Sequence, residues 1–181
     1  MANSKTKVIT GVVRLSYAHV LEPVAPLSGD GPAKYSASII IPKSDTETIN
    51  KIKAAIDVAL EEAVATKFGG KKLNASLVKV LRDGDVEREE DENYKDSYFV
   101  NAKSTTQPEI VDKNLQPILD KDEIYSGMYA RVSLSFYGYN VGGQKGVACG
   151  LGNIQKIKDG EKFGTNHSAA NDFSTVGDDF I

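Results

Sequence analysis

The stretch that most constrains the fold is GMYARVSLSFYGYN, residues 127–140, because its side chains alternate in character. The even positions are apolar: Met128, Ala130, Val132, Leu134 and Phe136. Successive side chains of a β-strand point to opposite faces. The spacing therefore predicts a long strand with one face in a core.

Other stretches predict strands that would join this one in a sheet. Residues 6–17 place Ile9, Val13, Leu15 and Tyr17 on one parity, which is typical of a half-buried strand. Residues 21–34 are rich in proline and glycine and predict a loop. Further strands are expected at 35–41, 77–82, 97–104 and 108–112, and a hairpin strand at 145–158 after a turn at 140–144.

One amphipathic helix is expected early in the chain. Ser44 and Glu47 form the S-x-x-E pattern of a capping box. Apolar residues follow at helical spacing: Ile49, Ile52, Ile56, Leu60, Val64 and Phe68. Gly69 and Gly70 end the pattern. The helix is expected to pack on the strands through this apolar stripe.

Many strands, one helix and no βαβ rhythm predict a mainly β protein of the α+β class. The expected architecture is an OB-like barrel of five strands with extensions, and a two-sheet sandwich is the alternative. Residues 1–160 are expected to form this domain. Residues 161–181, poor in large apolar side chains, are expected to form a flexible, disordered acidic tail.

Composition excludes several classes of protein. Cys149 is the only cysteine and His19 and His167 are the only histidines, so we expect no internal disulfide, no structural zinc site and no cofactor. No run reaches the roughly 18 apolar residues of a membrane span, and the first residues lack the apolar segment of a signal peptide. A cytoplasmic protein without membrane contact is therefore expected.

The net charge of −3 is unevenly distributed. Residues 83–96 hold eight acidic and two basic side chains, and residues 172–181 hold three acidic and no basic ones. The remainder of the chain is therefore basic, at about +6. A basic body can bind a polyanion, although the overall charge alone argues against one.

The odd positions of the 127–140 strand carry the pattern most suggestive of binding. Tyr129, Tyr137 and Tyr139 share this face with Arg131 and with two serines. Aromatic rings beside a cation are suited to base stacking and phosphate contact on single-stranded nucleic acid. The alternative is that these tyrosines pack under the helix or in a homodimer interface.

The strand at 97–104 repeats this combination of side chains. Phe99, Asn101 and Lys103 share a face and are expected to contact the same ligand. Arg14, Lys34 and Lys79 are further candidate phosphate ligands on polar faces. Each of these cations alone is unremarkable, and the prediction depends on their combination with the aromatic side chains.

Enzymatic functions are less well supported, and no enzyme is expected. Cys149 lies in VACGLGN, a glycine-rich strand without a nearby base, and no complete phosphate-binding motif is present. Asp83, Asp85, Glu87 and Asp91 could hold Mg²⁺ in a nuclease, which is one alternative function. A structural β-barrel protein of a virion is the other.

Three long blocks carry a resemblance to a known family: LRDGDVEREEDENYKDSYFVNAKS, YSGMYARVSLSFYGYN and GGQKGVACGLGNIQKIKDGE. The chain resembles a family of bacteriophage and prophage proteins that is similar to phage single-stranded DNA-binding proteins. The resemblance implies an OB fold, sequence-independent binding of single-stranded DNA, and a role in phage DNA replication and recombination.

The last residues, DDFI, resemble the acidic tails with a terminal aromatic residue that are common in such proteins, except that Phe180 is penultimate. Asp178, Asp179, Phe180 and Ile181 are therefore expected to act in two ways. The tail would occupy the basic body as a mimic of DNA. Once displaced, it would bind replication proteins such as a polymerase or a helicase-primase.

Overall fold

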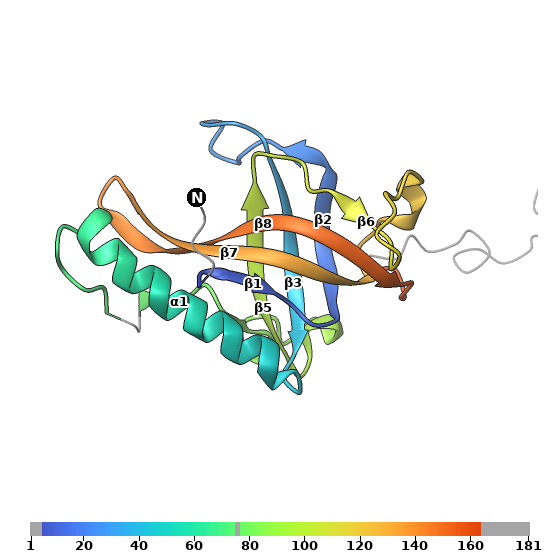
Figure 1. Cartoon of the computed structure of the whole chain (residues 1–181), viewed down its shortest axis with the longest axis horizontal. Coiled ribbons are helices and arrows are strands. Elements are labelled where there is room, and N and C mark those ends of the chain that lie inside the picture. Colours follow the sequence, from blue (N-terminus) through green and yellow to red (C-terminus); the bar gives the residue numbers. More distant parts are fainter. Residues whose placement is uncertain (1–4, 75–76, 164–181) are drawn as a thin grey trace, which may run out of the picture.

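The computed structural model describes residues 5–74 and 77–163 and consists mostly of strands (Figure 1). The strands are β1 (Lys7–Ile9), β2 (Val13–Val24), β3 (Lys34–Pro42), β4 (Arg82–Asp83), β5 (Ser97–Ser104), β6 (Ile110–Val111), β7 (Tyr129–Val141) and β8 (Gln144–Lys158). The helices are α1 (Thr46–Thr66) and α2 (Gly84–Glu87), with 3₁₀ turns η2 (Glu92–Tyr94) and η3 (Lys121–Glu123).

Five of these strands close into a barrel. Around the ring, β2 pairs with β3, β3 with β5, β5 with β8, β8 with β7, and β7 with β2. The β5–β8 contact is parallel and the other four are antiparallel. The short strands β1, β4 and β6 pair on the outside of this ring. The prediction of a five-stranded OB-like barrel with extensions is confirmed.

The alternation in β7 sets the inside of the barrel as predicted. Its even residues from Ala130 to Phe136 are at most 2% exposed, and its odd residues are partly or fully exposed. Helix α1 buries Ile49, Ile52, Ile56 and Leu60 against the barrel core. Figure 1 shows α1 running beneath β1 and β7.

A close approach between α1 and β7 depends on a glycine. A Cβ on Gly138 would lie only 2.3 Å from the Cβ of Ala63, so no larger residue fits between helix and strand. The part of the β7–β8 hairpin that extends beyond the barrel is therefore covered on one face by α1. Its other face carries Tyr137 and Tyr139.

Two local expectations near α1 were wrong. The N-cap is Asp45 rather than Ser44, and its carboxylate accepts hydrogen bonds from the Thr48 N–H and hydroxyl. The stretch 6–17 is two strands, because the chain turns at Gly11, whose N–H donates to the Thr48 hydroxyl. Ile9 is consequently 43% exposed instead of buried. Tyr17 is 59% exposed because β2 is irregular there: its φ is +47°, and the pairing with β3 shifts register between Ser16 and His19.

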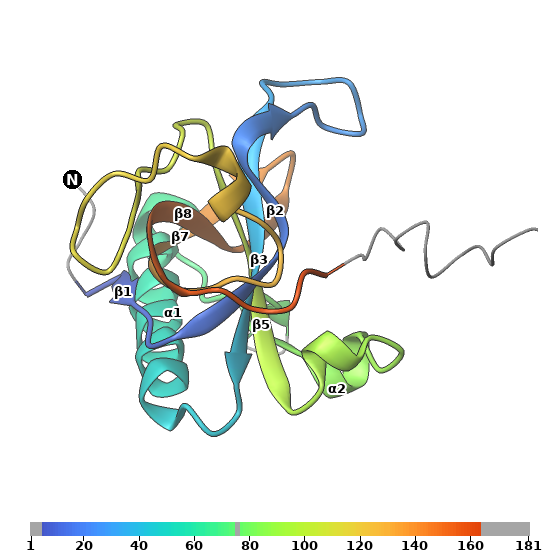
Figure 2. The same ribbon diagram turned by 90° about the vertical axis from the view of Figure 1, so that its right-hand side faces the viewer.

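The acidic block folds onto the barrel and is not a simple loop. Lys43 bridges Asp83 and Asp85 at 2.9 and 2.8 Å, and α2 and η2 follow. The predicted strand at 77–82 is also wrong, because only Arg82–Asp83 pairs with β5. Figure 2 shows α1 and α2 on opposite sides of β5.

None of the helices in the described ranges 5–74 and 77–163 has the length and apolar character needed to cross a membrane.

Candidate nucleic-acid interface

A groove of about 570 Å³ lies on the outer face of the barrel between β5, the β7–β8 hairpin and residues 77–82. We call it the tyrosine groove. It is lined by Lys34, Leu77, Lys79, Val80, Arg82, Asn101, Lys103, Tyr137, Tyr139 and residues 146–149. Six of the ten predicted DNA-binding residues therefore meet in one place: Lys34, Lys79, Asn101, Lys103, Tyr137 and Tyr139.

The tyrosine groove is electropositive. Lys34, Lys79, Arg82 and Lys103 line it, and none of its thirteen lining residues is acidic. Among the described residues, Lys34, Lys79 and Lys103 form no ion pair, whereas Arg82 pairs with Glu87 at 2.6 Å. Three exposed ammonium groups are thus available to an anionic ligand. A concave surface of one charge attracts such a ligand strongly.

The two tyrosines lie over a floor of small residues on β8. Tyr139 is opposite Gly146, and a Cβ on that glycine would lie 2.7 Å from the tyrosine oxygen. Tyr137 is opposite Ala148, and its ring edge comes within 3.6 Å of where a Gly150 Cβ would be. The small residues of β8 therefore make room for the two tyrosine rings to lie against that strand.

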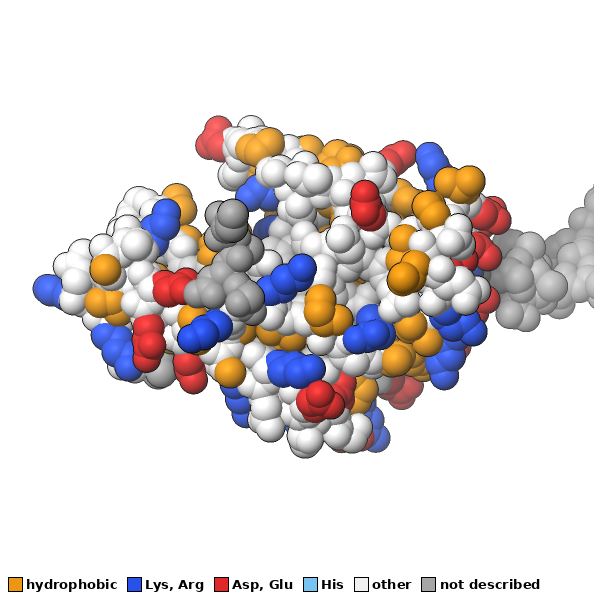
Figure 3. Space-filling view, in the orientation of Figure 1, with side chains coloured by type: hydrophobic (Ala, Val, Ile, Leu, Met, Phe, Trp, Pro, Cys, Tyr) orange, Lys and Arg blue, Asp and Glu red, His pale blue; other side chains and the backbone are white. Residues whose placement is uncertain are grey.

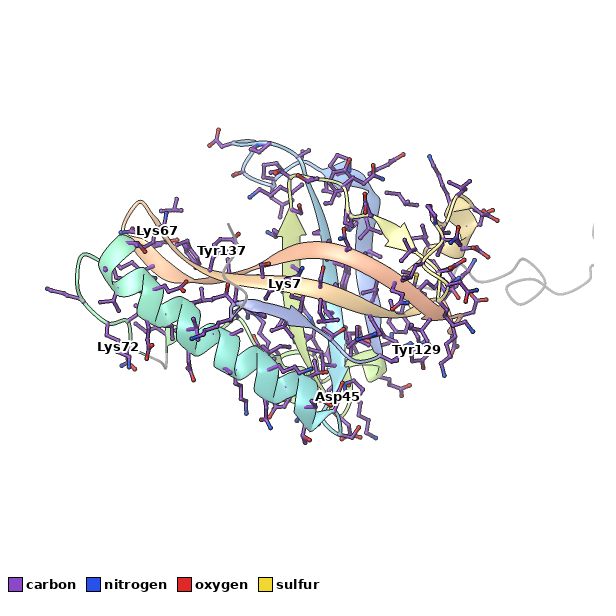
Figure 4. All side chains as sticks on the ribbon, viewed as in Figure 1. Lys7, Asp45, Lys67, Lys72, Tyr129 and Tyr137 are labelled. Carbon is purple, nitrogen blue, oxygen red and sulfur yellow. The ribbon has the colours of Figure 1, made fainter. Side chains whose placement is uncertain are left out.

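Of the two tyrosines in the groove, Tyr137 is the more available to a ligand. Its side chain is 51% exposed, and the other face of the hairpin rests on α1. Partial burial, together with the neighbouring Cys149, raises the pKa of the Tyr137 phenol. The ring is therefore neutral at physiological pH and does not repel phosphate. Figure 4 shows Tyr137 near one end of β7 and Tyr129 near the other.

Arg14 and Tyr129 lie together at the far end of β7, outside the tyrosine groove. The Arg14 guanidinium lies 4.8 Å from the Tyr129 ring centroid and 4.3 Å from that of Phe163. It also donates hydrogen bonds to the carbonyls of Gly127 and Glu161. These contacts hold residues 161–163 against the barrel, so Arg14 is largely occupied within the fold.

The prediction that Phe99 stacks on DNA is not supported by its position. Phe99 does point to the outer face with Asn101 and Lys103, but it is only 1% exposed. The ring of Tyr94 covers it edge-on at a centroid distance of 5.0 Å, and the Tyr94 hydroxyl bonds Ser38. The folded acidic block therefore buries this part of the face, and Phe99 belongs to the core.

Arg131 lies apart from the tyrosine groove, in a shallow groove of about 210 Å³ that also contains Lys7, Ile9, Ser133, Asn153 and Gln155. Its Nε donates to the Thr10 carbonyl at 3.2 Å. The four predicted tail residues, Asp178, Asp179, Phe180 and Ile181, lie outside the described residues.

The sequence pattern did not reveal Arg82 or the floor of the groove. Arg82 and Lys79 have opposite parity in a strand, and only the irregular backbone before β4 brings both into the groove. The floor has a readable signal, since Gly146, Ala148, Gly150 and Gly152 alternate with core residues along β8. A run of small residues at period two, opposite tyrosines and serines, indicates that side chains of the facing strand lie over them.

The groups considered for catalysis are engaged elsewhere. Burial raises the pKa of the Cys149 thiol, so it is protonated and unreactive at neutral pH. The carboxylates of Asp83 and Asp85 both bind Lys43, and Glu87 binds Arg82. Within residues 5–74 and 77–163, no three His, Cys, Asp or Glu side chains are grouped so as to hold a metal ion.

The location of the tyrosine groove agrees with the general binding surface of OB folds. These folds bind oligonucleotides on the face of their second and third strands and between the loops that join strands one to two and four to five. In this barrel those elements are β3, β5, the β2–β3 connection and the β7–β8 hairpin. Lys34, Asn101, Lys103, Tyr137 and Tyr139 come from them.

Comparison with known proteins places the chain in a family. The family model described as "Enterobacter phage Enc34, ssDNA-binding protein" matches residues 6–181. The chain belongs to this Enc34 ssDNA-binding protein family. A relative, protein p50 of Acyrthosiphon pisum secondary endosymbiont phage 1, is 34% identical over an alignment of 160 residues that covers 83% of each chain. The resemblance to phage ssDNA-binding proteins seen in the sequence is confirmed.

The chain shares its fold with solved structures of phage single-stranded DNA-binding proteins. The single-stranded DNA-binding protein from bacteriophage Enc34 in complex with ssDNA superimposes with a TM-score of 0.76 at 24% identity, over 89% of this chain and 91% of that one. The single-stranded DNA-binding protein gp2.5 of bacteriophage T7 gives a TM-score of 0.59 at 16% identity, over 93% and 99%. Both comparisons support the OB-like barrel.

Proposed function

We propose that this protein binds single-stranded DNA without sequence preference in the tyrosine groove and acts in phage DNA replication and recombination. The observation that carries the proposal is the groove itself. It combines four cations, no acidic residue and two tyrosines on the outer face where OB folds bind oligonucleotides. Membership of the Enc34 family gives independent support.

The cations supply affinity through the phosphates. Lys34, Lys79 and Lys103 are exposed and form no ion pair with another described residue, so phosphate contact does not require an existing salt bridge to break. Each phosphate contact on a single strand releases counterions and contributes about 0.7 to the salt slope. Binding is therefore steeply dependent on salt.

The tyrosines supply preference for single strands. A base can stack on the exposed face of Tyr137 only if it is not held in a duplex. Gly146 on the facing strand makes room for the Tyr139 ring, which lies against it, and the half-exposed Tyr137 ring is the one that a base can reach. Stacking and phosphate contact use features common to all nucleotides, and this gives binding without sequence readout.

No catalytic role is proposed for this site. Its polar groups are lysines, an arginine, an asparagine and tyrosines, and the carboxylates of Asp83 and Asp85 are held by Lys43. Binding, without cleavage, is the chemistry that this set of side chains serves.

The acidic segment 172–181 is proposed to compete with DNA for the basic body. Residues 1–160 were expected to form the binding domain and 161–181 the tail, but residues 161–163 are held against the barrel and belong with the domain. The support for this competition is the charge separation along the chain. A tethered competitor acts at a high effective concentration, and its ionic contact weakens as salt shortens the Debye length. Deleting 172–181 should tighten DNA binding most at low salt. Equal affinities of both proteins across a salt series would contradict this role.

The experiment that tests the function is a titration of labelled single-stranded and duplex oligonucleotides of equal length at two salt concentrations, with and without Mg²⁺. We expect tight, salt-dependent binding of single strands, weak binding of duplex and no cleavage. Equal affinity for both would overturn the stacking proposal. Cleavage that needs Mg²⁺ would indicate a nuclease, and no binding would leave a structural role.

A further inference from the structure

A continuous row of outward-facing residues crosses the barrel beside Tyr137. Lys7 on β1 pairs with Ser135 on β7, Ser135 pairs with Gly150 on β8, and Gly150 pairs with Lys103 on β5. Residues that pair across neighbouring strands project to the same face. The row therefore has a lysine at each end and two small residues between them.

The dimensions of this row suit a nucleic-acid backbone. Strands lie about 4.8 Å apart, so three steps separate the Lys7 and Lys103 backbones by about 14 Å. Ser135 and Gly150 present little bulk on that path. The Tyr137 ring lies beside the crossing, since its edge comes within 3.6 Å of where a Gly150 Cβ would be.

The row leads from the tyrosine groove to the second groove, which we call the Lys7–Arg131 groove. It is lined by Lys7, Ile9, Val111, Arg131, Val132, Ser133, Asn153, Ile154 and Gln155, and none of these residues is acidic. The Lys7 ammonium forms no ion pair with any residue of the described ranges. Figure 4 places Lys7 between Tyr137 and Tyr129 along β7, and Figure 3 shows Lys and Arg side chains spaced over this face.

We propose that single-stranded DNA leaves the tyrosine groove by crossing the β7–β8 hairpin at Ser135 and Gly150, and that its phosphates then bind Lys7 and Arg131. This inference rests on the proposed function and adds a second segment to the binding path. A base stacked on Tyr137 brings the adjoining backbone over Ser135 and Gly150. The polar amides of Asn153 and Gln155 line the groove beyond the crossing.

Oligonucleotide length separates the two grooves experimentally. Oligothymidylates of about 4, 8, 12 and 16 nucleotides cover the range of site sizes known for OB folds. They would be titrated into four proteins: the wild type, Lys7→Ala, Lys7→Glu, and the double variant that combines Lys7→Ala with Arg131→Ala. Lys53→Ala is the matched control, because Lys53 is an exposed lysine of α1 that lines neither groove. Thermal unfolding checks each variant, since Arg131 also bonds Thr10.

The expected result is length-dependent. The shortest strands that bind should bind all variants alike, because they fill only the tyrosine groove. Longer strands should lose affinity, and Lys7→Ala should lower their salt slope by about 0.7 for one lost phosphate contact, with a larger loss for Lys7→Glu. The proposed path would be overturned if Lys7→Ala kept the wild-type salt slope at every length. It would also be overturned if the variants lost the same affinity for strands of all lengths. Failure of the wild-type protein to bind any length would overturn the proposed function itself.

Discussion

Tyr137 is the single residue on which stacking most depends. Its ring is half exposed, neutral and placed over small residues of β8. Tyr137→Ala should therefore weaken single-strand binding by roughly 1–3 kcal/mol, the usual contribution of one stacked base. Tyr137→Phe should retain most of the affinity, because it keeps the ring. Fluorescence anisotropy with a labelled oligothymidylate measures both, and a similar loss in the two variants would show that the hydroxyl matters and the ring does not.

Phe99 should behave in the opposite way. It is buried against Tyr94 and Ile40, so Phe99→Ala should lower the free energy of unfolding by roughly 3–5 kcal/mol. Any loss of DNA binding should follow from unfolding alone. Urea denaturation and DNA binding, measured for both Phe99→Ala and Tyr137→Ala, test whether the first variant loses stability and the second loses affinity. A stable Phe99→Ala protein that fails to bind DNA would place the ring in the interface.

The contrast between these two residues shows what alternation predicts for a single side chain. Parity correctly assigned the faces of Tyr137 and Phe99, because both project outward from their strands. It did not predict that Tyr94, from a segment rich in acidic residues, would fold over Phe99 and bond Ser38. Such a tertiary contact leaves no periodic signal in the sequence.

Among the elements, the acidic segment 83–96 was expected to be a loop and instead forms a folded cover. Its position depends on Lys43, which bridges Asp83 and Asp85 from the end of β3. The Lys43 ammonium, and then the Asp96 N–H, hold the pKa of Asp85 below its ordinary value. A folded-state pKa that is lowered stabilises the fold above the unfolded pKa and loses this effect as pH falls through the folded value.

Acidification should therefore loosen this cover. Below about pH 4, the ordinary range of an aspartate, protonation of Asp85 should weaken its contact with Lys43 and increase the exposure of Tyr94. Asp85→Asn should lower the free energy of unfolding at neutral pH, and it should make that free energy depend less on pH in the acidic range. Urea unfolding followed by tyrosine fluorescence over a pH series measures this. Glu47→Gln, in an exposed pair with Lys51, is the control, and identical pH profiles for wild type and Asp85→Asn would contradict the bridge.

Most of the long elements could be predicted and the short ones could not. The exception is β2, which runs to Val24 and so includes residues 21–24 of the stretch expected to be a loop. The β5, β7 and β8 strands and helix α1 follow strong periodic patterns and lie close to their predicted bounds. The break at Gly11 and the irregular stretch 77–81 arise from contacts with α1 and the barrel that outweigh local alternation. This is why Arg82 and Lys7 were not identified as candidate binding residues, although both lie beside predicted ones.

For the whole molecule, the barrel closes so that residues from distant parts of the chain share one electropositive groove. Lys34, Lys79 and Lys103 come from three separate segments, and the fold adds Tyr137 and Tyr139 from a fourth. The sequence indicated these residues by type, and only the order of strands around the ring explains why they meet. The same closure separates Arg14 and Tyr129 from them.

The most direct measurement is the salt dependence of single-strand binding for a triple variant, Lys34→Ala with Lys79→Ala and Lys103→Ala. Each lost phosphate contact lowers the slope of log K against log salt by about 0.7, so the triple variant should lose about 2. The control replaces Lys51, Lys53 and Lys121, which are exposed and line neither groove, and it should keep the wild-type slope. An unchanged slope in a folded groove variant, or an equal decrease in the control, would contradict binding in the tyrosine groove.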